Sequence, residues 1–446
     1  MPQSERIGFD LWLRLGTHAE KDYAIKTTGI YDCIVLNANL VAATPGGSAS
    51  LVLRLQKPFV IDPMTYAFAL NPRYLLTQSK AKSTRGKLIV KKTYELLGNR
   101  YGPPVAGCAG RRRTQPSDFT ECNIDKFVSN VYEFQIRALP ETWEKEEEFR
   151  ELAALQYVGP YAVVSPYFYM SPGPRLEAWV ELNARLATAF RKCVPDEMAC
   201  YVPVCFDEVL LDSPEVVTRI SEALQLVPCT GYLIWVSDLR EQESGKARLR
   251  VLTELVRRLS MGGEKRVVNA HGGFFSCALR VFGMTGVSHG VGYGEHRDVT
   301  PVLGGGLPPV KYYYPPLKAL LIPTEIETIL PGIGVDTPRA FHERVCDCSI
   351  CRSVISNDIV EFEKFYEFKL NQEGNEVATP EAYNRSRFHY LLARKKEIDW
   401  LSTATIPQIV ETLRRSYGLY EEEVGLADVD YLETWAQVLN EAEGPG

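Results

Sequence analysis

Eight short apolar runs recur along this chain of 446 residues. Several are almost continuously hydrophobic, which is typical of parallel strands buried on both faces. Segments with helical periodicity follow three of the runs, at 176–193, 214–226 and 246–259. Eight strands alternating with helices favour a (β/α)8 TIM barrel, an α/β fold, over an open sheet. The runs lie at 32–38, 58–62, 161–169, 201–210, 231–238, 266–274, 286–294 and 310–314.

The alternation breaks between 80 and 155, where a basic run, three consecutive arginines and an acidic helical segment separate the second and third runs. Long insertions that follow a barrel strand often build the active-site face. The barrel pattern ends after Tyr314. We therefore predict a TIM barrel over 1–335, with an insertion at about 80–155 after the second strand, and a helical C-terminal appendage over 336–446.

Composition excludes several classes of protein. Hydrophobic residues make up 45% of the chain and charged residues 24%, so neither a disordered nor a fibrous protein is indicated. No apolar stretch approaches the roughly 20 residues of a membrane span, and the N-terminus lacks the pattern of a signal peptide. We expect a cytoplasmic protein without a membrane partner. Since the net charge is −6, any contact with nucleic acid must come from local basic patches.

Three cysteines form a C-x-C-x-x-C pattern in the segment RVCDCSICRS, at Cys346, Cys348 and Cys351. The other cysteines are scattered singly, as buried reduced thiols often are. The two short spacings allow one loop to place three thiolates on a Zn²⁺ ion, with a fourth ligand from elsewhere in the chain. The sequence therefore predicts a metal site in the appendage.

His389 is the best candidate for the fourth ligand. Thr379 can cap a helix that starts at Pro380, and such a helix would hold the imidazole rigidly over the loop. His342 is the alternative ligand. We predict a structural zinc, because Cys₃His fills all four positions and leaves none for water. The alternative interpretations of the C-x-C-x-x-C pattern are three ordinary reduced cysteines and an iron–sulfur cluster.

A barrel followed by C-x-C-x-x-C, and then by a helix that bears the fourth ligand, resembles the tRNA-guanine transglycosylase superfamily, including bacterial relatives that insert 7-deazaguanine bases into DNA. The resemblance runs from Asp32 to Trp400. It implies a pentosyltransferase that exchanges a guanine-type base in DNA or tRNA through a covalent carboxylate intermediate, while a second carboxylate activates the incoming base. The implied partners are nucleic acid, a guanine-like or 7-deazaguanine base, and a second copy or a larger assembly.

Two strand ends carry the implied site residues. Asp62 in PFVIDPMTYAFA resembles the aspartate at the end of the family's second strand, although Pro-Met-Thr-Tyr-Ala-Phe stands where the family has Ser-Gly-Gly-Phe. Asp62 would be the general acid/base. Asp207 in CFDEVLL resembles the family's Phe-Asp-Glu strand end, which implies that Asp207 reads the purine edge with Glu208 beside it.

The family's nucleophilic aspartate aligns near Val291, which has no nucleophilic atom. Three other carboxylates near strand ends remain as candidate nucleophiles: Asp238, Glu295 and Asp298. The segment HGGFF also follows a predicted strand, and we predict that His271, Gly272 and Gly273 bind substrate. Glycine allows close approach to a planar ligand, but turns that need a positive φ also require it.

Basic clusters in the insertion and in the appendage are the candidate contacts to nucleic acid, because neutralising several phosphates gives strong, salt-dependent binding. Each cluster alone is equally typical of a solvated surface. The candidates in the insertion are Lys80, Lys82, Arg85, Lys87, Lys91, Lys92, Arg111, Arg112 and Arg113, and those in the appendage are Arg385, Arg387, Arg394, Lys395 and Lys396.

Three functions are consistent with this sequence. The first is base exchange with a relocated nucleophile. The second is a transglycosylase-like barrel that recognises nucleic acid or a nucleotide as a subunit of a larger assembly, without exchange chemistry. The third is a barrel hydrolase that uses the polar residues at the strand ends.

Overall fold

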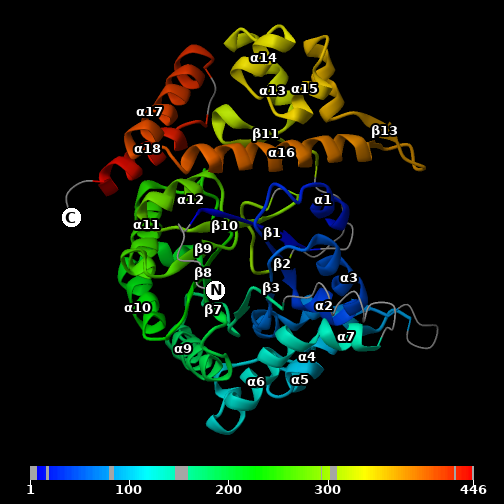
Figure 1. The fold of residues 1–446 in the computed structure, drawn as a ribbon, viewed down its shortest axis with the longest axis vertical. Helices are drawn as coiled ribbons and strands as arrows, with labels where there is room; N and C mark the ends of the chain where they lie inside the picture. Colours follow the sequence, from blue (N-terminus) through cyan, green and yellow to red (C-terminus); the bar gives the residue numbers. More distant parts are fainter. Residues whose placement is uncertain are drawn as a thin grey trace.

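A ring of eight parallel strands forms the centre of the computed structural model, with helices around it (Figure 1). The structure describes residues 8–16, 20–79, 85–145, 159–292, 294–301, 309–425 and 428–443. The strands are β1 (Asp10–Leu15), β2 (Cys33–Asn37), β3 (Phe59–Asp62), β6 (Ala162–Val164), β7 (Ala199–Asp207), β8 (Gly231–Ser237), β9 (Arg266–Asn269) and β10 (Gly286–Gly290).

Pairing along the chain nearly closes this ring. Neighbouring strands pair in parallel in the order β3, β2, β1, β10, β9, β8, β7 and β6, so that β1 pairs with β10 and joins the first strand to the last. Between β3 and β6, the amide of Tyr161 donates to the carbonyl of Phe59 at 2.8 Å. The predicted TIM barrel is therefore confirmed.

The strand assignment differs from the prediction at both ends of the barrel. The run at 310–314 contains β11 (Tyr312–Tyr314), which pairs antiparallel with β12 (Ala319–Leu321) outside the ring. The first barrel strand is β1, whose sequence DLWLRL lies outside the predicted runs because charged residues interrupt it. Asp62 therefore ends the third strand and not the second, and the insertion lies between the third and fourth strands.

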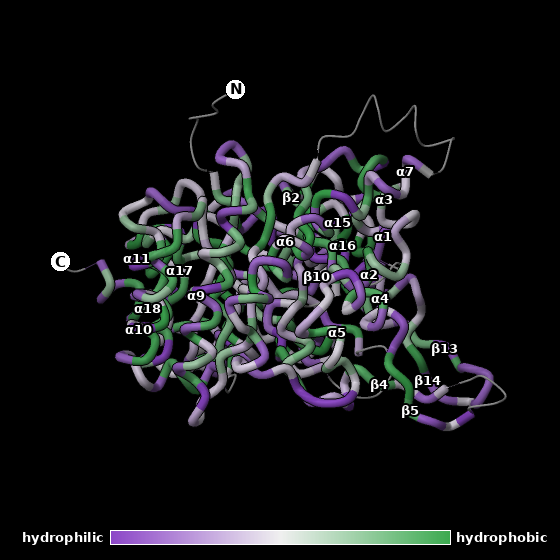
Figure 2. The backbone as a smooth tube through the Cα atoms, turned by 90° about the horizontal axis from the view of Figure 1, so that it is seen from below, coloured by the Kyte–Doolittle hydropathy of each residue, from purple (hydrophilic) through white to green (hydrophobic). Residues whose placement is uncertain are grey.

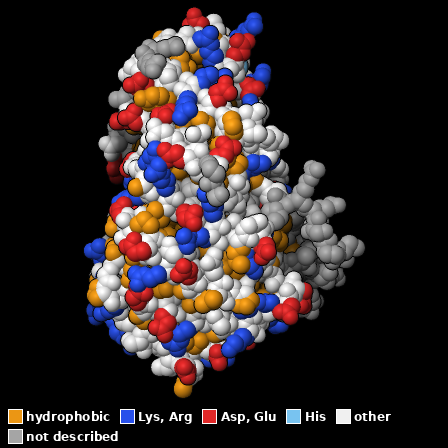
Figure 3. Space-filling model, turned by 90° about the vertical axis from the view of Figure 1, so that its left-hand side faces the viewer, with side chains coloured by type: hydrophobic (Ala, Val, Ile, Leu, Met, Phe, Trp, Pro, Cys, Tyr) orange, Lys and Arg blue, Asp and Glu red, His pale blue; other side chains and the backbone are white. Residues whose placement is uncertain are grey.

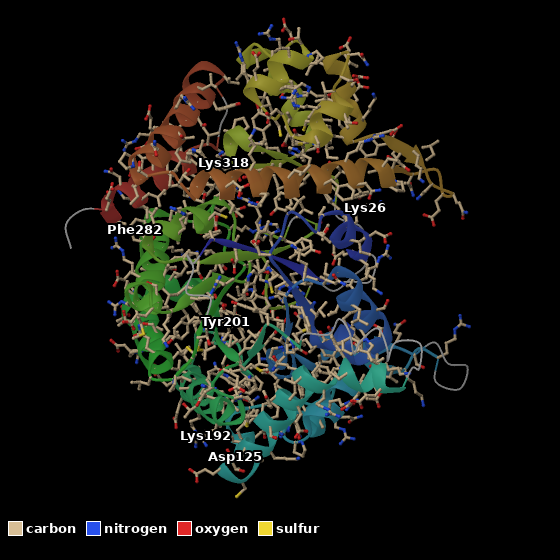
Figure 4. The ribbon with its side chains drawn as sticks, viewed as in Figure 1. Lys26, Asp125, Lys192, Tyr201, Phe282 and Lys318 are labelled. Carbon is tan, nitrogen blue, oxygen red and sulfur yellow. The ribbon has the colours of Figure 1, made fainter. Side chains whose placement is uncertain are left out.

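Side chains alternate between the inside and the outside of the ring. Trp12 and Tyr201 belong to a small apolar cluster of strand residues, and Tyr201 lies near the centre of the barrel in Figure 4. Leu11 and Leu13 belong to the large core between strands and helices. Arg14 has the same parity as Trp12, so it points into the barrel at the carboxyl end of β1. This end is the mouth, where barrel chemistry is normally located.

Helices cover the outside of the ring, and the three predicted helices are confirmed as α9, α10 and α11. None of the described helices combines the length and the apolar character that a bilayer crossing requires. The barrel helices outside the insertion and the appendage are α1 (Lys21–Lys26), α2 (Ala38–Ala43), α3 (Pro45–Leu55), α9 (Leu176–Cys193), α10 (Pro214–Gln225), α11 (Lys246–Ser260) and α12 (Phe274–Ala278).

The insertion consists of a protruding hairpin (Figure 2) and a group of helices that pack on one side of the barrel. The predicted acidic helix at 141–155 begins in α7, and its residues from 146 onward lie outside the described residues, as do Lys80 and Lys82. The elements of the insertion are β4 (Leu76–Gln78), β5 (Leu88–Val90), α4 (Lys92–Tyr101), α5 (Val105–Cys108), α6 (Glu121–Arg137) and α7 (Pro140–Lys145).

The appendage is organised around α16 (Pro380–Leu401), which lies between the barrel and the helices α13 to α15 (Figure 1). Its start agrees with the prediction, because the hydroxyl oxygen of Thr379 accepts a hydrogen bond from the amide of Ala382 at 3.1 Å. The other elements are α13 (Pro323–Ile329), α14 (Pro338–Arg344), α15 (Ser349–Val354), β13 (Phe368–Leu370), β14 (Glu376–Ala378), α17 (Ile406–Tyr417) and α18 (Tyr431–Glu443).

A buried charge cluster joins α16 to the barrel. Arg394 is fully buried and forms ion pairs with Glu295, which follows β10, and with Glu397 at 2.9 Å. Glu397 also contacts the ammonium of Lys318 at 3.1 Å and accepts from the hydroxyl of Tyr313 at 2.8 Å; Lys318 is labelled in Figure 4. The guanidinium therefore compensates two carboxylates that come from the two parts of the chain.

Replacing Arg394 is expected to destabilise the whole protein. Arg394→Gln leaves Glu295 buried without its cation and Glu397 with Lys318 alone, so we expect the free energy of unfolding to fall by about 3–5 kcal/mol in urea denaturation. Lys395→Gln, on the exposed side of the same helix, is the control and should change it by less than about 0.5 kcal/mol. Equal stabilities of the two variants would contradict this role.

Candidate metal centre and barrel mouth

The four predicted metal ligands lie together. Cys346 follows α14, Cys348 caps α15, Cys351 lies within α15, and His389 comes from α16. The Nδ1 atom of His389 is 3.7 Å, 3.4 Å and 3.3 Å from the three sulfurs in chain order. All four ligand atoms lie within 4.8 Å of one another. The predicted cluster is therefore confirmed as a group of side chains.

Neighbouring groups orient the two ends of this cluster. The Nε2 atom of His389 lies 2.6 Å from the carbonyl oxygen of Tyr313, so Nε2 donates to this carbonyl and Nδ1 is the nitrogen that faces the sulfurs. The ring of Tyr312 stacks on the imidazole at 3.9 Å between centroids, and its hydroxyl is 3.1 Å from the sulfur of Cys351. Metal-binding histidines usually have such a second hydrogen bond.

The donor set and its dimensions fit a single metal ion. A tetrahedral ion with the usual metal–sulfur and metal–nitrogen bonds separates nitrogen from sulfur by about 3.6 Å, close to the spacing found here. Burial opposes a charge on His389, but the sulfurs of Cys346 and Cys348 outweigh it and raise the pKa of His389 to about 10. The three sulfurs therefore stabilise a positive charge that lies between them. The cluster could bind a metal ion.

His342, the alternative fourth ligand, lies elsewhere. Its Nδ1 atom is 3.1 Å from the carbonyl oxygen of Cys346, and its Nε2 atom is 2.9 Å from that of Ile355. Both ring nitrogens face backbone carbonyls of the segment 346–355, which we call the cysteine loop. His342 therefore braces this loop, and His389 completes the cluster.

Asp62 lies inside the barrel mouth and is held by three groups. Its Oδ2 accepts from the guanidinium of Arg14 at 2.7 Å, and its Oδ1 accepts from the amide of Met64 and the hydroxyl of Tyr167, both at 3.0 Å. Arg14 also donates to Asn37 at 3.2 Å. Burial disfavours the charge of Arg14, but Asp62 and Tyr167 raise its pKa above the ordinary value. The mouth thus contains a buried ion pair.

Aromatic rings extend from Asp62 across the mouth. Tyr167 contacts Tyr66 with ring centroids 5.4 Å apart, and Tyr66 contacts Trp235 edge to face at 5.0 Å. Trp235 contacts the ring of His271 at 4.9 Å. These four rings form a continuous wall, which we call the aromatic wall. All four residues are buried, so a planar ligand would have to enter between them to stack on a ring face.

His271 provides a hydrogen-bond acceptor next to this wall. Burial, together with the positive charges of Arg14 and Arg297, holds its pKa well below the ordinary value. Its Nδ1 atom lies 3.4 Å from the carbonyl oxygen of Gly294, so the neutral ring donates through Nδ1. Nε2 then carries a lone pair, and it is buried without a partner among the described residues. It can accept a hydrogen bond from a ligand N–H or O–H group.

The two predicted glycines have a structural role. The amide of Gly273 donates to Glu241 at 2.9 Å. A Cβ atom added at Gly273 would lie 2.6 Å from Glu241, and one added at Gly272 would lie 2.7 Å from Ser276. The close backbone approach predicted here is therefore made to side chains of the protein itself.

Asp207 and Glu208 point in different directions at the end of β7. Asp207 accepts from the amide of Val209 at 3.0 Å and from the hydroxyl of Tyr169. Glu208 lies 3.4 Å from the guanidinium of Arg248 on α11. Asp207 is therefore the residue of this pair that lies beside the aromatic residues of the mouth.

Among the described contacts, none of the three candidate nucleophiles bonds to Asp62. Glu295 pairs with Arg394. Asp298 accepts from the hydroxyl of Ser237 at 3.0 Å and from the amide of Thr300 at 2.7 Å. Asp238 follows β8 with a left-handed backbone, φ 56°, and its side chain is 44% exposed and lies 3.6 Å from the guanidinium of Arg240. Asp238 is the least constrained of the three.

The predicted basic patches differ in their exposure. Arg394 is fully buried, so its assignment to nucleic-acid binding is wrong. Lys91 donates to the carbonyl of Tyr74 at 2.8 Å, and Arg112 forms two 2.7 Å bonds with Asp118. Lys87, Lys92, Arg111, Arg113 and Lys396 are exposed, and Lys395 is partly exposed. On the face shown in Figure 3, acidic and basic side chains are interspersed without a large area of one sign.

Arg14, Tyr167 and Trp235 are mouth residues that the sequence analysis missed. Arg14 was overlooked because its strand was not predicted. A charged residue at an alternate position of an otherwise apolar run, as in DLWLRL, is the pattern that indicates it. Tyr167 lies within a predicted strand, but nothing in the sequence indicates that its hydroxyl reaches Asp62 across the sheet.

Comparison with known proteins adds little. No family model matches the chain, and a search of curated proteins finds no significant match. Among solved structures, xylanase B from Clostridium stercorarium F9 has 8% identity and a TM-score of 0.32, covering 60% of this chain and 71% of that one. An endo-1,4-beta-D-xylanase from Clostridium thermocellum, solved with xylohexaose, has 9% identity and a TM-score of 0.36, covering 65% and 61%. These scores carry no functional argument.

The cysteine cluster is expected to determine the metal content of the purified protein. We expect about one metal ion per chain by elemental analysis, as a Cys₃His site requires. Cys348→Ser removes one ligand and should lower the content well below this value. Cys122→Ser is the matched control, because Cys122 is exposed and lies outside the cluster. A wild-type protein that is purified without metal, and whose stability does not depend on metal, would contradict the assignment.

Proposed function

We propose that this chain is a transglycosylase-like barrel that recognises a guanine-type base of nucleic acid or of a nucleotide at its mouth, without exchanging the base. The observation that carries this proposal is the pairing of Asp62 with Arg14. A general acid/base must exchange protons with its substrate. Both carboxylate oxygens of Asp62 already accept hydrogen bonds from protein groups, and its ion-pair partner is buried.

The mouth has the groups that base recognition requires. The aromatic wall offers a stacking surface for a planar ring. The lone pair of His271 and the carboxylate of Asp207 are acceptors, which match the N1–H and N2–H₂ donors of guanine. A base buried in nucleic acid would have to leave its stack to reach these groups. Assembly into a larger complex would supply any chemistry that this barrel lacks.

We further propose that the metal is a structural Zn²⁺ ion held by Cys346, Cys348, Cys351 and His389. Three sulfurs and one imidazole nitrogen fill a tetrahedral shell, and Zn²⁺ accepts this donor set without a geometric preference of its own. The bound ion would join the cysteine loop to α16. Elemental analysis that finds iron in place of zinc would refute this identity.

Base exchange is the second candidate function, and Asp238 favours it. A non-glycine residue held at positive φ at a strand end is often functional, and this carboxylate is accessible. In that reaction the carboxylate attacks the sugar C1′, the glycosidic bond breaks, and the departing base takes both the bonding electrons and a proton. The deprotonated incoming base then attacks C1′ and releases the carboxylate.

One experiment distinguishes the two candidates. The intact protein is incubated with tRNA, or with single-stranded DNA that contains guanine, together with labelled guanine. We expect nucleic acid to bind without incorporation of label and without a covalent adduct. Asp207→Asn should weaken binding by at least about tenfold, because it changes one acceptor into a donor. Glu215→Gln, an exposed change on α10, is the control.

Two results would overturn the proposal. Incorporation of label that is lost in Asp238→Asn would establish exchange in place of recognition. No binding to either nucleic acid, with Asp207→Asn indistinguishable from wild type, would refute both candidate functions.

A further inference from the structure

A pocket of about 480 Å³ opens beside the barrel mouth. Three segments that are far apart in the chain enclose it: the stretch that follows β3, the loop before α6, and the connection from β6 to α9. Thr300, from the segment after β10, completes the wall. Tyr169 lines this pocket and also bonds through its hydroxyl to Asp207. The pocket and the predicted base reader are therefore separated by a single tyrosine side chain.

The charge of this pocket has one sign. Each of the three segments contributes one arginine to the wall: Arg73, Arg113 and Arg175. No aspartate or glutamate is among the described residues that line it. None of these arginines forms an ion pair with a carboxylate within the described part of the chain. Glu177, in the first turn of α9, instead pairs with Arg219 at 2.8 Å.

Neutral partners position two of the three guanidinium groups. Arg73 donates to the hydroxyl of Tyr74 at 2.9 Å and lies over its ring at 4.9 Å. Arg175 donates to the amide oxygen of Gln115, which also lines the pocket. Each guanidinium has five N–H donors, so these contacts leave most of the donors available. The arginines are thus oriented but not neutralised.

Two further features of the wall suit an anion. The N-terminus of α9, a helix of 18 residues, begins at the pocket and carries partial positive charge, with the amide of Leu176 already bonded to the carbonyl of Gly173 at 3.1 Å. Thr114 is fully buried and lines the pocket. Its hydroxyl lies near the thiol of Cys108 and has no hydrogen-bond partner of good geometry among the described residues. A ligand oxygen could satisfy this hydroxyl.

Arg73, Arg113 and Arg175 are exposed, and three like charges that line one concave site repel one another unless an anion lies between them. Arginine forms bidentate hydrogen bonds with phosphate, which makes phosphate the anion that best fits three guanidinium groups. We propose that this pocket binds a phosphate group of a nucleotide or of a nucleic-acid strand. The phosphate would belong to the nucleotide whose base lies at Asp207. This last step rests on the proposed function, whereas phosphate binding itself does not.

The test measures calorimetric binding of GMP, guanosine, inorganic phosphate and a short single-stranded oligodeoxynucleotide to the intact protein. Arg73→Gln, Arg113→Gln and Arg175→Gln should each weaken GMP and oligonucleotide binding roughly tenfold and leave guanosine binding unchanged. Each variant should also reduce the slope of log affinity against log salt for the oligonucleotide by about 0.7. Arg339→Gln is the control, because Arg339 is exposed on α14 and lies outside the pocket.

The outcomes separate the pocket from the base site. If GMP and guanosine bind equally and no pocket variant affects either, the phosphate pocket is refuted while base recognition stands. If guanosine does not bind, but phosphate or oligonucleotide binding depends on the three arginines, the pocket stands and the proposed base recognition falls. If all pocket variants bind every probe as Arg339→Gln does, the pocket proposal is overturned.

Discussion

The buried guanidinium of Arg394 connects the two parts of this molecule. It lies on α16 five residues after His389, so one helix carries both a ligand of the cysteine cluster and the cation that pairs with Glu295 of the barrel. A buried cation is tolerated only when its partners are in place. The metal cluster is therefore positioned relative to the barrel by an electrostatic requirement as well as by apolar packing.

The same helix completes the wall of the barrel. His289 points outward from β10, and its ring contacts Tyr390 of α16 with centroids 4.9 Å apart. In a regular TIM barrel, a helix that follows the last strand would cover this position. Here the chain first forms the β11–β12 hairpin and the cysteine loop, and only then supplies the covering helix. This order explains why the appendage is continuous with the barrel core.

Much of the architecture could be predicted from sequence, and the exceptions have a common cause. Seven barrel strands, three of the surrounding helices and the capped start of α16 follow from apolar periodicity and local capping rules. Strand β1 was missed because Arg14 looks like a surface residue until its partner Asp62, 48 positions away, is known. Arg394 was misassigned for the same reason. Charge in a sequence does not reveal whether a distant partner will bury it.

Closure of the ring has a consequence for how the chain is made. Strand β1 is synthesised well before β10, the strand with which it pairs, because residues Gly286–Gly290 leave the ribosome much later. Until then, one edge of β1 has no partner, and an unpaired parallel edge promotes aggregation. Bringing such distant segments together is also slow. We therefore expect the nascent chain to depend on chaperones during translation.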